Sequence, residues 1–370
     1  MEQLASHAKV FVAPGFLEQD VHGSIGCHEC HGGEPSEPDL LAAHAGVVRD
    51  PTKRDAEAVC GPCHEELVME QSKSLHFTCA PIAAMIGLRA GPDPELRVEV
   101  QAGSAQHCGA CHASCGQCHV SRPAYVQGGL LDGHFFQGTP PMREVCTACH
   151  GSRVEREYFG LNQGLPPDVH WRKRFFRCVQ CHGGDEMHAA TGSVSDRYQA
   201  SGAPQCVGCH QDIYADGAEN RAQHEQHRDR VSCQVCHAVG YKNCYGCHLA
   251  LDKHGFTFFR NDRDELDFRI GFNPDPMPRR PEIFVVLRHV PVAPDTFAYY
   301  AGGEVGAFDA LPTWKPATPH NIQRKTPQGG DCNACHGSAE LFLTAEKVDE
   351  AERKANSPVI VPEDGIPARQ

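Results

Sequence analysis

Cysteine and histidine recur along this chain in one fixed pattern: cysteine, two residues, cysteine and then histidine. The 370 residues include 21 cysteines and 24 histidines, and ten copies of the pattern use all but one of the cysteines. Shuffling a chain of this composition would give roughly 0.1 such matches, so chance does not explain them. The cysteine pairs are Cys27 and Cys30, Cys60 and Cys63, Cys108 and Cys111, Cys115 and Cys118, Cys146 and Cys149, Cys178 and Cys181, Cys206 and Cys209, Cys233 and Cys236, Cys244 and Cys247, and Cys332 and Cys335, and the histidines that follow them are His31, His64, His112, His119, His150, His182, His210, His237, His248 and His336.

The C-x-x-C-H pattern is the attachment signature of c-type haem. Two thiols about one helical turn apart can each add to one vinyl group of the porphyrin, and the adjacent histidine places an imidazole under the iron. A single C-x-x-C would also suit half of a zinc site or a thioredoxin-like redox pair. Because neither alternative needs a histidine at that fixed place, ten copies predict ten covalently bound haem c groups with ten proximal iron ligands.

The fourteen histidines outside the motifs decide how each iron is completed, since a second imidazole on every iron requires ten of them. His7 and His22 are held in reserve, and we expect His28, inside its own attachment motif, not to reach back over a haem. His224 and His227 are three residues apart, so on a helix they would project from one face toward two neighbouring haems. The predicted distal ligands are His44, His76, His107, His134, His170, His188, His224, His227, His289 and His320.

The motifs also suggest how the chain is organised. Steps of 27 to 32 residues separate the motifs that start between Cys115 and Cys233, but the intervening sequences differ, so no solenoid repeat is predicted. The closer pairs, Cys108 with Cys115 and Cys233 with Cys244, predict haems nearly in contact. We divide the chain into a haem-rich domain at 1–248 with nine motifs, a haem-free wrapping or docking segment at 249–331, and the last haem site with a C-terminal helix and extended tail at 332–370.

The expected fold class is mainly α, with much irregular structure and few short strands, because the chain holds 36 glycines and 27 prolines. A short helix with Asp39 as its N-cap would carry His44, and residues 64–77 continue as a helix out of the second motif. Residues 344–356 resemble an exposed amphipathic helix. The β-branched run at 281–292 predicts a short strand that delivers His289. A multihaem cytochrome c fold organised around a chain of ten haems would accommodate this sparse secondary structure.

Three features outside the motifs each leave two interpretations open. The segment 249–331 either wraps haem faces and supplies His289 and His320, or forms a docking surface for a partner or another copy. The proline-rich tail at 357–370 either packs on its own subunit or reaches a neighbour. Cys79, the one cysteine outside the motifs, is either a buried free thiol or a redox-sensitive or cross-linking one.

The cofactor also predicts the compartment. Covalent haem attachment is completed outside the cytoplasmic membrane, so we expect an exported, periplasmic or extracellular protein whose leader was removed or omitted, since the first residues lack the apolar core of a signal peptide. No run of eighteen apolar residues predicts a membrane span. The net charge is −13, and each ferric haem with two imidazoles and two propionates would add about one more negative charge. This charge argues against a nucleic-acid partner and favours basic redox partners.

Size then bears on the spacing of the haems. A compact chain of this length has a radius of gyration of about 21 Å, so ten evenly scattered haems would have centres about 20 Å apart. We therefore expect a continuous row of haems through which electrons can hop, with the ends of the row near the surface.

The segments around these motifs resemble multihaem c-type cytochromes. Stretches such as SLHF, DVHW, HEQHRDRVSCQVCH and LPTWKPATPHNIQRKTPQ, spread over almost the whole chain, are similar to poorly characterised multihaem cytochromes of anaerobic and metal-cycling bacteria. Those are loosely similar to octahaem tetrathionate reductases and hydroxylamine oxidoreductases. Such enzymes typically carry eight haems where this chain has ten motifs, and the C-x-x-C-Lys site of some relatives is absent from the sequence. The resemblance implies haem iron and redox function without specifying a reaction.

Three classes of function remain. The leading hypothesis is an electron conduit with two histidines on every iron, including a form that polymerises into filaments; its partners would be other redox proteins, extracellular electron acceptors or copies of itself. A reductase of small sulfur or nitrogen oxyanions would need one open iron and a nearby acid or base such as Tyr241, Lys242, Lys73, Tyr299 or Tyr300. A zinc or disulfide scaffold would be colourless. No catalytic residue is assigned under the leading hypothesis.

Overall fold

The computed structural model describes residues 4–109, 113–123, 126–189, 197–200, 202–261 and 265–369. Its secondary structure is mainly helical, with much irregular chain and few short strands, which confirms the expected class. The α-helices are α1 (Phe16–Gln19), α2 (Cys27–His31), α3 (Leu40–Ala43), α4 (Pro51–Arg54), α5 (Ala56–Val59), α6 (Gly61–Gln71), α7 (Leu75–Thr78), α8 (Ala80–Ala90), α9 (Pro94–Cys108), α10 (Cys115–His119), α11 (Thr147–His150), α12 (Arg156–Tyr158), α13 (Val169–Arg174), α14 (Gly184–Met187), α15 (Cys206–Cys209), α16 (Arg221–His227), α17 (Cys233–His237), α18 (Ala298–Ala301), α19 (Pro327–Gly330) and α20 (Arg353–Asn356).

The remaining regular structure consists of short turns and strands. The 3₁₀ or π turns are η1 (Ala8–Val10), η2 (Val21–Ser24), η5 (Met142–Cys146), η6 (Gly151–Glu155), η7 (Cys178–Gln180), η8 (Gln211–Tyr214), η9 (Cys332–Ala334), η10 (Ala345–Lys347), η11 (Glu350–Glu352) and η12 (Glu363–Gly365). The strands are β1 (Tyr241–Lys242), β2 (Cys247–Leu251), β3 (Thr257–Asn261), β4 (Leu266–Asp267), β5 (Arg269–Phe272), β6 (Phe284–His289) and β7 (Trp314–Pro316).

Several motifs form a single helical turn of their own. Helices α2, α10, α15 and α17 each begin at the first cysteine of a motif. At α10 the turn is started by a capping box, in which Ser114 accepts from the Gln117 amide while the Gln117 side chain accepts from the Ser114 amide. One helical turn brings residues three and four apart onto the same face, so both cysteines and the histidine of a motif point the same way.

Local helix predictions were confirmed in part. Asp39 caps α3 by accepting from the amides of Leu41 and Ala42, and His44 follows the last helical residue. The helix expected over 64–77 is divided, because α6 ends at Gln71 and Ser74 starts α7 as its N-cap. The exposed helix expected over 344–356 is wrong: the segment is split into η10, η11 and α20. Its Asn356 is buried, and the Asn356 side chain hydrogen-bonds to the Trp314 amide and the Thr313 hydroxyl.

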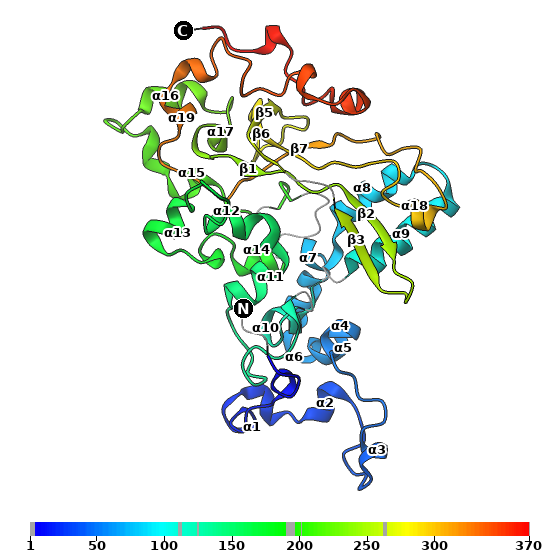
Figure 1. The fold of residues 1–370 in the computed structure, drawn as a ribbon. Helices are drawn as coiled ribbons and strands as arrows, with labels where there is room; N and C mark the ends of the chain where they lie inside the picture. The colour runs from blue at the N-terminus through cyan, green and yellow to red at the C-terminus, as the bar shows by residue number, and fades with distance from the viewer. Residues whose placement is uncertain are drawn as a thin grey trace.

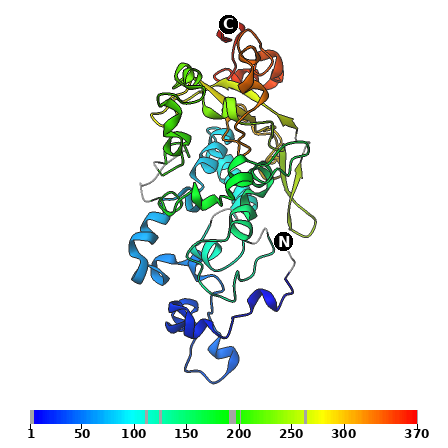
Figure 2. The ribbon, with the colours of Figure 1, turned by 90° about the vertical axis from the view of Figure 1, so that its left-hand side faces the viewer.

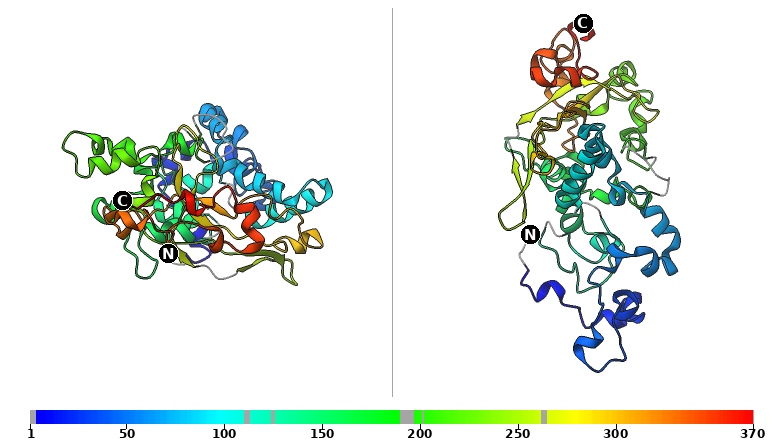
Figure 3. Two further views of the ribbon diagram at one scale, coloured as in Figure 1. Left: turned by 90° about the horizontal axis from the view of Figure 1, so that it is seen from above. Right: turned by 90° about the vertical axis from the view of Figure 1, so that its right-hand side faces the viewer.

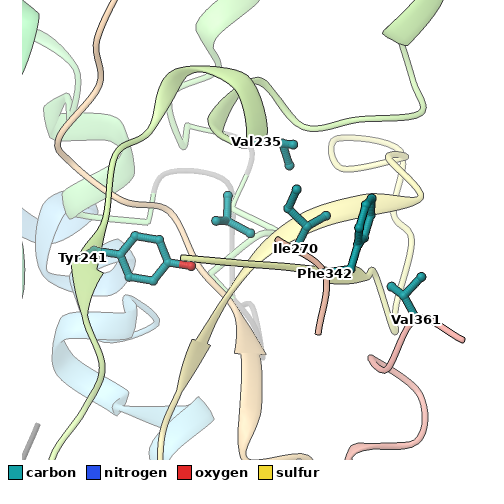
Figure 4. Packing of buried hydrophobic residues seen from close by; sticks show 6 residues of the cluster. Val235, Tyr241, Ile270, Phe342 and Val361 are labelled. Atoms are coloured by element: carbon teal, nitrogen blue, oxygen red, sulfur yellow. The ribbon is translucent and has the colours of Figure 1, made fainter. Parts of the chain in front are cut away.

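The hydrophobic core lies around a three-stranded antiparallel sheet in the order β5-β6-β7. Strand β6 confirms the predicted strand at His289, and its Val286 is fully buried. One face packs Val235, Tyr241, Ile270, Phe342 and Val361 together, as Figure 4 shows. The other face packs Val285, Leu287, Trp314, Leu343, Val348 and Val359. The core therefore unites residues from all three parts of the chain distinguished above.

The tail is part of this core. Val359 and Val361 are fully buried, the Val361 amide donates to the Leu343 carbonyl, and the Phe272 amide donates to the Val359 carbonyl. Of the two interpretations of the tail, the described structure supports packing on its own subunit.

The molecule is elongated. Helices α1–α3 (blue) lie at one end and the C-terminal segment (red) at the other, in the front view and after rotation by 90° to either side (Figures 1, 2 and 3). The surface area is 21290 Å², against about 14,500 Å² for a compact monomer of this mass. None of the described helices combines the length and apolar composition needed to span a bilayer.

Candidate metal centres

Eight motif histidines each face a second histidine in the described part of the chain. In every pair one ring belongs to a C-x-x-C-H motif and the other comes from outside the motifs. The ring centroids lie 6.2 Å apart for His64 and His22, 5.9 Å for His31 and His134, 6.2 Å for His150 and His76, 6.2 Å for His119 and His188, 6.0 Å for His210 and His170, 6.3 Å for His182 and His320, 6.3 Å for His237 and His224, and 6.2 Å for His336 and His227.

These distances match two imidazoles on opposite sides of one metal ion. With about 2.0 Å from metal to nitrogen and about 1.1 Å from nitrogen to ring centre, trans ligands have centroids about 6.2 Å apart, whereas two ligands of a tetrahedral zinc have centroids about 5.1 Å apart. Among the described residues, no three His, Cys, Asp or Glu side chains gather into a group that could hold a metal ion. The paired histidines could therefore hold a metal ion between two imidazoles.

One continuous cavity of about 5660 Å³ joins the eight pairs. All sixteen paired histidines line it, together with the cysteines of the same eight motifs. Ordinary pockets for one small ligand measure about 300–1,000 Å³. The cavity therefore has room for several large ligands side by side, and its walls present thiols and imidazoles to each.

Backbone carbonyls fix the orientation of five paired rings. Where the Nδ1–H of a histidine donates to a carbonyl, Nε2 is left facing the partner ring, which is the usual arrangement around a metal-bound histidine. The acceptors are the carbonyls of Val48 for His31 (2.7 Å), Gln137 for His119 (2.6 Å), Gln223 for His227 (2.7 Å), Gln323 for His237 (3.0 Å) and Ala368 for His336 (2.9 Å).

At three further rings a carboxylate, instead of a backbone carbonyl, is the partner of Nδ1. Nδ1 lies 2.9 Å from a carboxylate oxygen in His22 with Asp20, His170 with Asp168, and His182 with Glu186.

Burial disfavours the charged form of several of the paired imidazoles. It lowers the pKa of His76, His134, His150 and His188, and it lowers the pKa of His320 to about 4. The neutral ring is the form that binds a metal. His134 also has a φ of 83°. This left-handed backbone conformation is uncommon for residues other than glycine and tends to occur at functional sites.

Helix α16 carries both His224 and His227. The two rings face His237 and His336, which belong to different motifs. One short helix therefore places a second imidazole opposite two motif histidines, and binding to two haems stays a prediction.

The proximity of thiols from different motifs gives the order of the motifs in space. The thiols of Cys60 and Cys115, of Cys146 and Cys178, and of Cys206 and Cys233 lie close enough to shift each other's pKa. Cys30 is also an electrostatic neighbour of Cys60, as Cys118 is of Cys146, Cys181 of Cys206, and Cys335 of Cys236. These neighbours link eight motifs into one row in chain order, starting at Cys27–His31 and ending at the motif of Cys332 and Cys335.

Comparison with protein families, curated proteins and solved structures finds no match for this chain.

Seven of the ten predicted distal histidines lie in these pairs, and the other three have different contacts. His44 is exposed, and its Nδ1 donates to the Leu40 carbonyl. His107 is buried and its Nε2 lies 2.7 Å from the Tyr300 hydroxyl. The Nε2 of His289 lies 2.9 Å from Glu352, and its ring stacks on Trp314. Strand β6 thus carries His289 as expected, but its ring contacts Glu352 and Trp314 instead of a motif histidine.

His22, which the sequence suggested only as a reserve ligand, is the eighth paired histidine from outside the motifs and faces His64. A sequence signal for it existed: Asp-Val-His occurs at residues 20–22 and again at 168–170, where His170 is a predicted ligand. In both places the aspartate holds the histidine that follows it.

The described residues do not place two of the ten motifs in this row. Of the third, Cys111 and His112 lie outside the described residues, as does the Cys108 side chain, so its predicted closeness to Cys115 is not described. The ninth begins at Cys244, which lines the cavity. Its His248 is on β2, and His248 Nδ1 lies 3.2 Å from an oxygen of Asp295.

Proposed function

We propose that this chain is a c-type cytochrome that binds ten haems covalently and conducts electrons along them. The observation that carries the proposal is the set of eight histidine pairs at trans-ligand distance on the wall of one cavity. The motif cysteines would hold each porphyrin through its vinyl groups, the motif histidine would bind the iron from one side, and the paired histidine would bind it from the other. The bound haem iron would supply reversible one-electron chemistry.

The row of motifs supports conduction over isolated storage. Neighbouring thiols such as Cys146 and Cys178 belong to different motifs, so the porphyrins that they would hold would be close neighbours. The row follows the chain from the α2 end of the molecule to the C-terminal end, which are its two extremes (Figure 1). Haems held at these motifs would form a path for single electrons along the length of the protein.

The pairing also favours a carrier over a reductase. A reductase needs an iron with an open position, whereas the eight paired motif histidines each have a second imidazole opposite. Tyr241, a candidate acid for the reductase, is buried, and its hydroxyl donates to the Leu287 carbonyl. Its position is that of a core residue beneath the sheet.

The setting that we propose follows from the cofactor and the charge. Haem attachment places the protein in the periplasm or outside the cell. A net charge of −13 favours basic redox proteins or extracellular acceptors as partners. Filament formation from copies of the chain is one form of this proposal. The buried tail does not supply a free arm for it, because Val359 and Val361 belong to the subunit's own core.

The test is production of the exported protein in a host that attaches haem. We expect a red protein whose mass exceeds that of the polypeptide by ten haems, and a Cys146→Ala, Cys149→Ala variant that carries nine. After reduction, carbon monoxide should leave the spectrum of the eight paired centres unchanged. A mass equal to that of the bare polypeptide would overturn the proposal.

A further inference from the structure

The paired imidazoles differ in what their Nδ1 atoms face. Five face a neutral backbone carbonyl. Three face a carboxylate at 2.9 Å: His22, His170 and His182. The difference is one of charge, since a carboxylate bears a full negative charge and makes a stronger hydrogen bond than a carbonyl.

Asp20 and Asp168 are built in the same way. Each lies two residues before its histidine and is almost completely buried, with side-chain exposures of 9% and 3%. Oδ1 of each accepts from both the amide and Nδ1 of the histidine. Oδ2 of each accepts from an amide far along the chain, Phe136 for Asp20 and Ile322 for Asp168, at 2.8 Å. Three hydrogen bonds thus hold each carboxylate against one imidazole.

Glu186 reaches the same geometry by another route. It lies four residues after His182, on α14, and its side chain is 15% exposed. The partner of His182 is His320, and the Ile322 amide bound by Asp168 lies two residues after His320. Asp168 therefore contacts His170 directly. It also binds the backbone next to His320, which belongs to the neighbouring pair.

A carboxylate on Nδ1–H changes the metal as well as the ring. It draws the proton toward itself, makes the imidazole a stronger electron donor and so favours the ferric over the ferrous ion. Burial strengthens the effect, because little water screens the charge.

We propose that Asp20, Asp168 and Glu186 are positioning residues that lower the reduction potentials of the irons bound at His22, His170 and His182. This inference rests on the proposed function. Two of the three centres are neighbours in the row, because the Cys181 and Cys206 motifs adjoin. They form a low-potential segment in the middle, whereas the centres at His31 and His336, at the two ends, have carbonyl-bound rings. An electron that moves from one end of the row to the other therefore passes through centres whose reduction potentials are lower than those at the ends.

The experiment is a spectroelectrochemical titration of the intact ten-haem protein and of the variants Asp168→Asn, Glu186→Gln and Asp20→Asn. The amide oxygen of each variant can still accept from the imidazole, so the ring stays oriented while the charge is lost. In each variant we expect the reduction potential of one haem to rise by about 59 mV, which corresponds to a tenfold change in the equilibrium constant of a one-electron couple. Asp168→Asn and Glu186→Gln should move different couples, and their combination should move both.

Asp267→Asn is the matched control. Asp267 is a partly buried carboxylate, but it pairs with Arg269 and accepts from the Phe268 amide instead of an imidazole. Its titration curve should coincide with that of the parent protein. Unchanged couples in the three variants, with all ten haems retained, would overturn the inference and leave the proposed function standing. A parent protein without haem would overturn both.

Discussion

His224 and His227 lie on the same face of helix α16, yet they face the histidines of two different motifs. The rings of His224 and His237 are 6.3 Å apart, and those of His227 and His336 are 6.2 Å apart. Because residues three apart on a helix share a face, a helix of seven residues can complete two centres near the C-terminal end of the row.

The first prediction follows from this helix. Replacement of either histidine by alanine should open one iron and let the reduced protein bind one more carbon monoxide than the parent protein, because that iron would lose its second imidazole. The double variant should bind two more than the parent. The measurement is a carbon monoxide titration followed by absorbance. His254→Ala, which removes an exposed histidine on the turn between β2 and β3, is the control and should bind no more than the parent. Equal carbon monoxide binding in all variants would contradict the pairing.

The second prediction concerns the order of the row. Cys206 lies near Cys233 on one side and Cys181 on the other, which places its motif inside the row. Removing both cysteines of this motif by Cys206→Ala and Cys209→Ala should leave nine haems and interrupt conduction. Removing Cys27 and Cys30 at one end should also leave nine haems but only shorten the row. Current through an oriented protein monolayer measures this; equal losses in the two variants would refute the serial order.

The third prediction concerns a buried ion pair behind His320. Glu157 is 2% exposed; it pairs with Arg288 and accepts from the His320 amide at 2.8 Å. Burial raises the pKa of Glu157, and Arg288 opposes that rise. Glu157→Ala should lower the free energy of unfolding by about 3–5 kcal/mol, because it leaves an uncompensated buried guanidinium.

An exposed ion pair offers the matched control for that variant. Glu219 and Arg324 are more than half exposed, so Glu219→Ala should cost about 0–1 kcal/mol. Chemical denaturation of the haem-loaded protein, followed by far-ultraviolet circular dichroism, compares the two variants. A cost for Glu157→Ala as small as that of Glu219→Ala would show that the buried pair does not support the fold.

The fourth prediction tests the role of the tail. Val361 is fully buried against Phe342 and Ile270, so Val361→Ala should cost about 2 kcal/mol. Val98 on α9 is 66% exposed, and Val98→Ala should change stability by less than about 0.5 kcal/mol. Thermal unfolding of the haem-loaded protein separates the two. A silent Val361→Ala would mean that the tail is not part of the subunit's own core.

Local chemistry made much of the site predictable. A motif histidine must follow its two cysteines directly, so all ten proximal candidates could be read from spacing alone. Likewise His224 and His227 were predictable as a pair, because three residues on a helix determine a common face. Asp39 was recognisable as a helix cap for the same reason: a cap depends on the few residues that follow it.

Long-range contacts were not predictable in this way. His182 and His320 are 138 residues apart, and no periodicity connects them. His289 looked equally suitable as a ligand, but β6 places it against Trp314 and Glu352. Residues 344–356 carry a helical pattern, yet packing of Asn356 and Val348 into the core broke the helix into short turns, as tertiary contacts often override helix propensity.

The sequence by itself therefore determined which side chains could bind haem, because thioether attachment and proximal ligation require two cysteines and a histidine at fixed positions within five consecutive residues. Tertiary structure alone decided which distant imidazole stands about 6 Å from each motif histidine, which motifs are neighbours, and which rings face a carboxylate. Those choices depend on how remote segments pack against one another, and that packing is a property of the whole folded chain.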